Sequence, residues 1–276
     1  VTEVGEDLAG GSGAEFDAQG GFVIPGLWEA HAHLDLEAAR AARLDTSSTA
    51  SAEEALAMVA HALVDGNHAG AGGVGTVQGF GHRLSAWPRI PTVAELDAVS
   101  GDVPTVLISG DVHSGWVNSA ALRALGLQGA TPQDPGAPLS EDAWFEAMNR
   151  LDVIPGTAEL RESGYRRVLA DLLGRGVTGV VDMTQPLTPE DWPRRVRSWG
   201  IDAQQDNSAA VFSPRIRASI YRSQLGQWRA AGLHTGEGLP GSPLLGDGTP
   251  LFTQGPLKVI SDGSMGTQTA YMRDPY

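Results

Sequence analysis

The sequence predicts a parallel α/β fold of the (β/α)8 barrel type. Strand-like segments alternate with helix-like segments along the 276 residues, which is the pattern of parallel sheets whose strands are joined by helices. Several strand-like segments end in side chains that can bind metals or move protons, and chemistry at the carboxyl ends of strands is typical of such barrels. About five or six strand-like segments are present, so we expect an incomplete barrel.

The N-terminal half begins with an apolar run, FVIPGL at 22–27, which we expect to be a buried parallel strand because it lacks alternation. Ser51 and Glu54 form a capping box that predicts a helix over 52–66, because each side chain can bond to an orphan backbone N–H of the first turn. Further expected elements are a strand at 72–80, a short helix capped by Thr92 and Glu95, a strand at 103–111, and a helix at 119–126 capped by Asn118.

The C-terminal half continues the same alternation. Thr188, followed by Pro189, predicts the start of a helix over 188–199, because proline suits the first turn. The other expected elements are helices at about 140–150 and 157–175 and strands at 177–183, 209–221 and 256–262.

Composition excludes several classes of function. The net charge of −14 argues against a nucleic-acid partner, because phosphate binding needs a basic surface. No stretch reaches the roughly 20 apolar residues that span a bilayer, so no membrane partner is expected. The chain has no cysteine, so any metal must be held by nitrogen and oxygen atoms. With no signal-peptide pattern, a cytoplasmic protein is expected.

His31 and His33 follow the apolar run and are candidate metal ligands. Residues two apart on a strand point to the same side, so both imidazoles can reach one cation. The alternative is that they are simply two polar residues where a strand passes into a loop.

Five segments resemble the metal-dependent amidohydrolases, and specifically amidohydrolase family 3, the branch that contains N-substituted formamide deformylases. They are VIPGLWEAHAHL, WPRIPTVAELDAV, DVHSGWVNSAALRALGL, LRE and LKVISDGSMGTQTA, which occur in the family's order over nearly the whole chain. The resemblance implies a metal-bearing barrel beside a small β-sandwich built from both chain ends. Residues 1–21 would then be a remnant of the sandwich and 22–276 the N-terminal part of the barrel. Two later histidines and an aspartate of the family pattern are absent, so we expect a fragment that is inactive alone.

Lys258 is the only lysine, since the 18 other basic residues are all arginine. In many members of this superfamily a lysine at the end of the fourth barrel strand takes up CO2 and becomes a carbamate that bridges two metals. The resemblance therefore implies that Lys258 joins His31 and His33 as a metal ligand, with one or two divalent ions, of which zinc is expected. An amine can undergo this reaction and a guanidinium cannot. The alternative is an ordinary strand lysine.

Asp111 and His113 lie in a segment that resembles the rim of the family's pocket. We expect His113 to be a catalytic and substrate-binding residue that hydrogen-bonds a substrate carbonyl or oxyanion, with Asp111 orienting its imidazole. The alternative is a structural network leading to the cap at Asn118. His82, in another strand-end loop, is expected at most to line the pocket.

The resemblance implies a hydrolase that uses metal-activated water to cleave a C–N bond in an amide-like small molecule. A related deaminase or lactone hydrolase, and a non-catalytic scaffold, remain alternatives. The expected partner is the small-molecule substrate, together with a second copy if the complete protein is a homodimer.

Overall fold

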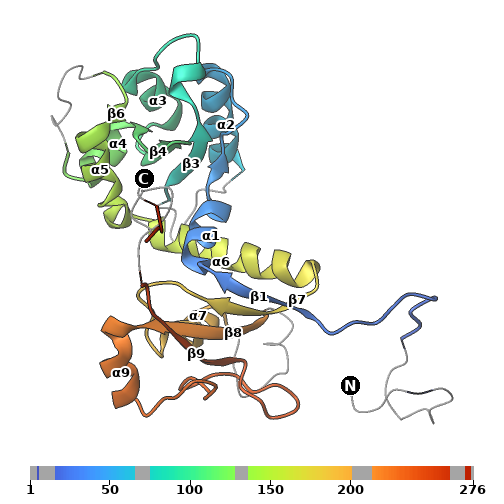
Figure 1. Ribbon diagram of the computed structural model, residues 1–276. Helices are drawn as coiled ribbons and strands as arrows, with labels where there is room; N and C mark the ends of the chain where they lie inside the picture. Colours follow the sequence, from blue (N-terminus) through green and yellow to red (C-terminus); the bar gives the residue numbers. More distant parts are fainter. Residues whose placement is uncertain are drawn as a thin grey trace.

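The computed structural model describes residues 5, 16–65, 75–127, 136–200, 213–261 and 271–274, and it contains two separate sheets (Figure 1). One sheet has four strands in the order β1-β7-β8-β9, and the other has five in the order β2-β3-β4-β5-β6. Because the chain leaves the first sheet after β1 and returns to it at β7, the second sheet belongs to an insertion. We call residues 44–153 the inserted lobe.

The four-stranded sheet is parallel throughout. Its strands are β1 (Leu27–Ala32), β7 (Val177–Asp182), β8 (Arg215–Tyr221) and β9 (Phe252–Lys258). Helix α7 (Asp191–Ser198) follows β7, and the short segments η3 (Arg222–Gln224) and α9 (Leu225–Ala230) follow β8. Because all the strands run the same way, their carboxyl ends lie at one edge of the sheet.

The inserted lobe has a mixed sheet. Its strands β2 (Leu44–Asp45), β3 (Val77–His82) and β4 (Thr105–Ser109) are parallel to one another. Strand β5 (Ser114–Val117) runs antiparallel to both of its neighbours, β4 and β6 (Leu139–Ser140). Its helices are α2 (Ala52–Val64), α3 (Val93–Ser100), α4 (Ser119–Ala124) and α5 (Glu141–Met148), with short 3-10 segments η1 (Leu84–Ala86) and η2 (Leu151–Val153).

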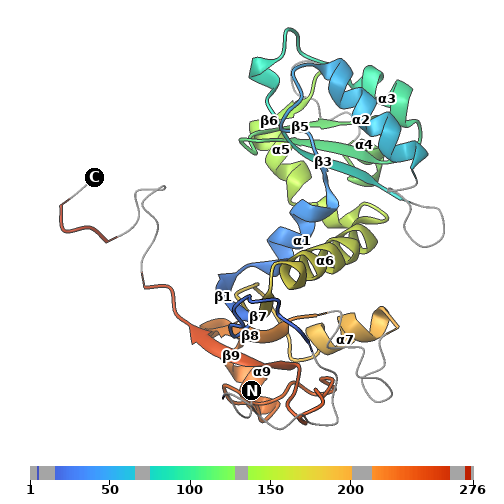
Figure 2. The same cartoon turned by 90° about the vertical axis from the view of Figure 1, so that its right-hand side faces the viewer.

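Two helices connect the inserted lobe to the four-stranded sheet, namely α1 (Leu34–Ala42) and α6 (Thr157–Gly174). Figures 1 and 2 both show them side by side between the two sheets. Gly164 permits this contact, because a Cβ added there would lie 1.9 Å from the carbonyl oxygen of Ala38. Any larger residue at this position would force α6 away from α1.

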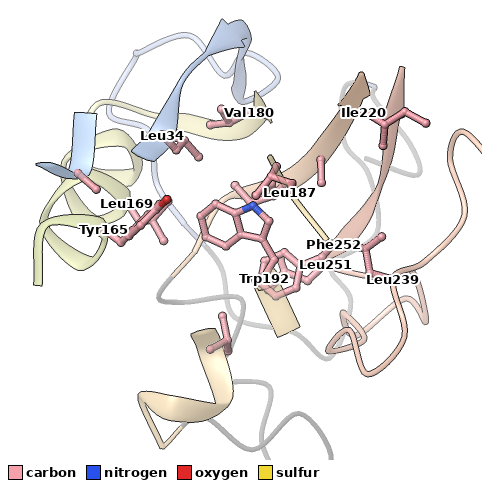
Figure 3. Packing of buried hydrophobic residues seen from close by; sticks show 14 of the residues in the cluster. Leu34, Tyr165, Leu169, Val180, Leu187, Trp192, Ile220, Leu239, Leu251 and Phe252 are labelled. Carbon is pink, nitrogen blue, oxygen red and sulfur yellow. The ribbon is translucent and has the colours of Figure 1, made fainter. Parts of the chain in front are cut away.

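The core under the four-stranded sheet is built around Trp192 of α7 (Figure 3). Its ring lies 5.5 Å from that of Tyr165 in an edge-to-face arrangement and 5.7 Å from that of Phe252. Leu34 and Leu169 complete the contact with α1 and α6. Burial of each such side chain contributes about 1.5–3 kcal/mol, so this cluster holds α6 and α7 to the sheet.

The helix caps form at the expected residues, but the capping box expected at Ser51 is only half made. The Ser51 side chain accepts the Glu54 N–H, whereas the Glu54 carboxylate accepts the Ala50 N–H instead of that of Ser51. Asn118 accepts the Ala121 N–H. Thr92 and Glu95 make both bonds of a capping box. The helix expected over 188–199 begins later, at Asp191, although the Thr188 N–H is bonded to the Asp191 carboxylate at 2.6 Å.

Two expectations about the fold are corrected. The apolar run at 22–27 is not a buried strand, since β1 begins only at Leu27 and Phe22 is 98% exposed. The strands do not share one sheet, and those of the described residues close no barrel. The sandwich remnant expected at 1–21 stays a prediction, because only Gly5 and residues 16–21 of this segment are described.

Candidate metal and catalytic site

His31, His33 and Lys258 meet at the carboxyl edge of the four-stranded sheet. His31 lies in β1, His33 is the N-cap of α1, and Lys258 is the last residue of β9. The Nζ atom of Lys258 lies 3.2 Å from Nε2 of His31, and the two imidazole centroids are 5.5 Å apart. Side chains from the first and last strands of this sheet, 227 residues apart, therefore come together.

Tyr221, the last residue of β8, lies beneath Lys258. The Nζ atom is 5.5 Å from the centre of the tyrosine ring, within the range of a cation–π contact. The Tyr221 hydroxyl donates to the carbonyl oxygen of Met183, just after β7, at 2.8 Å. The ring is thus fixed by the neighbouring strand. Sequence reasoning missed Tyr221, although its place at the end of the strand before Lys258 was a usable signal.

Asp182 holds the backbone that follows His33. This carboxylate is fully buried at the end of β7 and accepts the Leu34 N–H at 3.2 Å. It also accepts the Thr184 N–H at 3.1 Å, the Thr184 hydroxyl at 2.7 Å and the Trp192 indole N–H at 3.0 Å. Burial raises the pKa of Asp182 above its ordinary value. The residue next to His33 is therefore tied to β7 and α7.

The donor set of this site fits a divalent metal under one condition. Two imidazoles can bind zinc, but an ammonium group cannot, so Lys258 must first become a carboxylated amine. In the part of the chain that the structure describes, no three His, Asp or Glu side chains gather as a metal site. Asp262, which ends the expected strand at 256–262, lies outside the described residues.

Asp111 and His113 lie in the inserted lobe, in the turn between β4 and β5. The Ser109 hydroxyl donates to Asp111, and so does the backbone N–H of His113 at 3.0 Å. These two bonds, the Ser109 hydroxyl first, hold the pKa of Asp111 below its ordinary value. The expectation that Asp111 orients the imidazole is wrong. The ring nitrogen Nδ1 of His113 instead lies 3.4 Å from the Glu141 carboxylate.

The backbone around His113 is strained. Val112 has φ of 59°, which a β-branched residue rarely adopts, and Glu141 has φ of 48°. The Trp144 indole donates to the Val112 carbonyl oxygen at 2.9 Å and helps to hold this conformation. Residues in such conformations persist where the surrounding structure enforces them, often at functional sites. All the contacts of His113 described above lie within the inserted lobe, whereas His31, His33 and Lys258 belong to the other sheet.

His82 is part of the core of the inserted lobe. It ends β3, is 0% exposed and stacks on Trp87 with a centroid distance of 5.1 Å. Both ring nitrogens lack a hydrogen-bond partner among the described residues. Burial lowers the pKa of His82 to about 4, because the charged imidazolium would lose its hydration.

The stability of this chain is expected to fall as the pH drops from about 6.5 to about 4. His82 takes up a proton at pH 6.5 in the unfolded chain but only near pH 4 in the fold, so protonation favours unfolding across that window. The full effect is about 3 kcal/mol. Urea unfolding at several pH values measures it. His82→Phe, which keeps a ring against Trp87, should flatten the slope, and an unchanged slope would contradict this assignment.

Glu162 joins two helices. It accepts the Arg195 Nε–H at 3.0 Å and the Trp199 indole N–H at 3.2 Å, and so connects α6 to α7. Of the other histidines, His61 and His234 are exposed and each lies beside a carboxylate, and His68 lies outside the described residues.

The family model for the amidohydrolase family matches residues 14–276. The chain is 32% identical over 187 residues to an N-substituted formamide deformylase of Arthrobacter pascens, covering 60% of this chain and 33% of that protein. It is 31% identical over 180 residues to the exoenzymes regulatory protein AepA of Pectobacterium carotovorum subsp. carotovorum, covering 62% and 36%. It is 23% identical over 283 residues to the putative amidohydrolase YtcJ of Bacillus subtilis strain 168, covering 95% and 47%.

Two solved structures have a similar fold. Both are uncharacterized metal-dependent hydrolases, from Pyrococcus horikoshii OT3 with a TM-score of 0.63 and from Pyrococcus furiosus with a TM-score of 0.62. Each is 21% identical to this chain and matches 91% of it, against 46% and 47% of their own chains. The chain thus spans about a third to a half of the length of these relatives. No helix in the described residues is long and apolar enough to cross a membrane.

Proposed function

Because the chain belongs to amidohydrolase family 3, we propose that it forms the metal-binding half of a hydrolase that cleaves a C–N bond in an amide-like small molecule. The observation that carries the proposal is the meeting of His31, His33 and Lys258 at one edge of a parallel sheet. The relative named as an N-substituted formamide deformylase supports an amide-like substrate, and the two solved metal-dependent hydrolases support a metal.

We propose further that β1, β7, β8 and β9 are the first four strands of a (β/α)8 barrel. The outer strands support this idea, because both expose apolar side chains. Leu27 in β1 is 50% exposed, and Leu257 in β9 is 44% exposed. Further strands placed beside β1 and β9 would cover these side chains and pair the edge of β1 that has no partner strand in the described residues. The outer edge of β9 is already bonded at Phe252 and Gln254 to residues 236–239, so only its carboxyl-terminal part offers an edge to a further strand.

In this proposal His31 and His33 would hold a divalent ion such as zinc, and Lys258 would serve as a third ligand once its amine had added to CO2 and lost a proton to give a carbamate. The ion supplies Lewis acidity, which lowers the pKa of water and polarises a carbonyl group. Tyr221 keeps the Lys258 side chain over the sheet, and Asp182 fixes the backbone beside His33. His113, held by Glu141, donates to the substrate carbonyl oxygen if the inserted lobe closes over the site.

Metal binding by this chain tests the proposal. The 276-residue chain should bind Co2+, used as a spectroscopic substitute for zinc, and His31→Ala or His33→Ala should weaken binding by at least about tenfold. His61→Ala is the matched control, because this exposed histidine lies beside Asp65, away from the proposed ligands, and its loss should leave the affinity unchanged. Equal affinities in all four proteins, measured by titration of the Co2+ absorption bands, would contradict the assignment of the ligands.

A further inference from the structure

Arg43 is a half-buried cation whose terminal nitrogens are unused by the described part of the protein. It follows α1, and its Nε–H donates to Oε1 of Gln78 at 3.4 Å. No carboxylate in the described residues lies within ion-pair distance of it. Burial, and then the positive charge of Arg161, lower the pKa of the Arg43 guanidinium below its ordinary value, and the negative charge of Asp152 offsets only part of this effect. An arginine held in this way lacks the anion that usually accompanies a partly buried guanidinium.

Two small adjoining recesses, both open to solvent, lie against Arg43. Both are lined by Arg43, Gln78 and Leu160, so they meet at the junction of α1, β3 and α6. The first also contains Arg161 and Asp152, and the second contains Arg167. Their position is where the inserted lobe joins the rest of the structure.

The side chain of Arg43 is held in place by its hydrogen bond to Gln78, which is itself fixed. Gln78 is only 4% exposed, and its Nε2–H donates to the Thr157 hydroxyl at 3.0 Å. That hydroxyl donates in turn to the Leu151 carbonyl oxygen at 3.2 Å. Because the amide of Gln78 is oriented by this chain of bonds, its oxygen faces Arg43, and the terminal guanidinium nitrogens remain available to the recesses.

The recesses carry an excess of positive charge in a strongly acidic chain. Their ionised side chains are three arginines and one aspartate. Asp152 is already bonded to Arg161, and Arg167 donates to the Ala41 carbonyl oxygen at 3.1 Å. The balance is two positive charges, whereas the whole chain has a net charge of −14. This local field favours an anion.

We infer that the Arg43 recess binds a small oxyanion, either a carboxylate or a phosphate group. A guanidinium can donate two parallel N–H bonds to either group. Arg43 and His33 flank opposite ends of α1, a nine-residue helix about 13 Å long. The site is therefore separate from the proposed metal site, and the inference does not rest on the proposed function.

Equilibrium dialysis of the 276-residue chain against radiolabelled phosphate tests the inference, with succinate in a second series to separate the two sources of the oxyanion. The measurement works for monomers and oligomers alike. Arg43→Gln should weaken binding by about tenfold or more, and Arg43→Lys should recover only part of it. Arg40→Gln is the matched control, because Arg40 lies on the same helix but is exposed and pairs with Glu37.

Two results would overturn the inference. One is that neither phosphate nor succinate shows saturable binding at low ionic strength. The other is equal weakening by Arg40→Gln and Arg43→Gln, which would indicate general attraction to surface charge. Retention of the far-UV circular dichroism of Arg43→Gln guards against loss of the fold. Failure here leaves metal binding by His31 and His33 untouched, so the two proposals fail separately.

Discussion

In the hydrolase proposed above, replacing Lys258 with arginine is expected to reduce hydrolysis by at least about a hundredfold while preserving the fold. The stem of arginine is similar in length, and the partly exposed position beside Tyr221 can hold a guanidinium. A guanidinium cannot become a carbamate, and it would place a fixed positive charge 3 Å or so from His31. The measurement is kcat on an N-substituted formamide, with metal content determined in parallel.

Two comparisons separate a metal ligand from a lysine that only packs. Lys258→Ala should regain activity when formate or acetate is added, because a small carboxylate can occupy the vacated space. Lys258→Arg should not regain activity, because its side chain fills that space. In the 276-residue chain, bicarbonate should increase metal uptake by the wild type but not by either variant. Near-normal turnover and metal content in Lys258→Arg would show that Lys258 is not a ligand.

The second large effect is expected at Asp182, whose replacement by alanine should destabilise the fold by about 4 kcal/mol or more. The substitution leaves the N–H groups of Leu34, Thr184 and Trp192 without their acceptor, and each buried unsatisfied donor costs about 1–3 kcal/mol. Urea unfolding, followed by tryptophan fluorescence and circular dichroism, measures the loss. A change below about 1 kcal/mol would mean that the Asp182 carboxylate does not organise this region.

A double-mutant cycle sharpens the test. Asp182→Asn keeps one oxygen for the Leu34 and Thr184 donors but turns an NH2 group toward the Trp192 indole N–H, so two donors face each other. Trp192→Phe removes the opposing donor. The cost of Asp182→Asn should therefore be smaller in the Trp192→Phe background than in the wild type. Strictly additive costs would contradict the hydrogen-bond geometry around Asp182.

The sequence predicted well those features that depend on a few adjacent residues. The caps at Ser51, Thr92 and Asn118 form as expected, because each bond is made within one helical turn. The partner of the His113 ring was not predictable in this way. Glu141 lies 28 residues further on and reaches His113 only because β5 pairs with β6.

The division into two sheets could not be predicted from local pattern. The strands at 77–82 and 177–182 both alternate with helices, yet β3 pairs with β4 and β7 pairs with β1. Which strands pair depends on how side chains far apart in the sequence pack against one another. For the proposed site, the pattern His31-Ala-His33 indicated a pair of ligands, but only the resemblance to the amidohydrolases placed Lys258 beside them. The apolar run at 22–27 was wrongly predicted to be a buried strand, because hydrophobicity alone does not show whether a segment pairs with another strand.

The inserted lobe has a consequence for synthesis of the chain. Leu27 of β1 pairs with Val177 of β7. The ribosome must therefore add about 150 residues after Leu27 before its partner Val177 is made. At about 5–20 residues per second, β1 waits roughly 8–30 s for its neighbour. The parallel strands β3 and β4 of the inserted lobe, by contrast, are separated by only 28 residues at Val77 and Thr105. The inserted lobe can therefore fold first, and once it is compact it shortens the loop that must close before β1 and β7 meet.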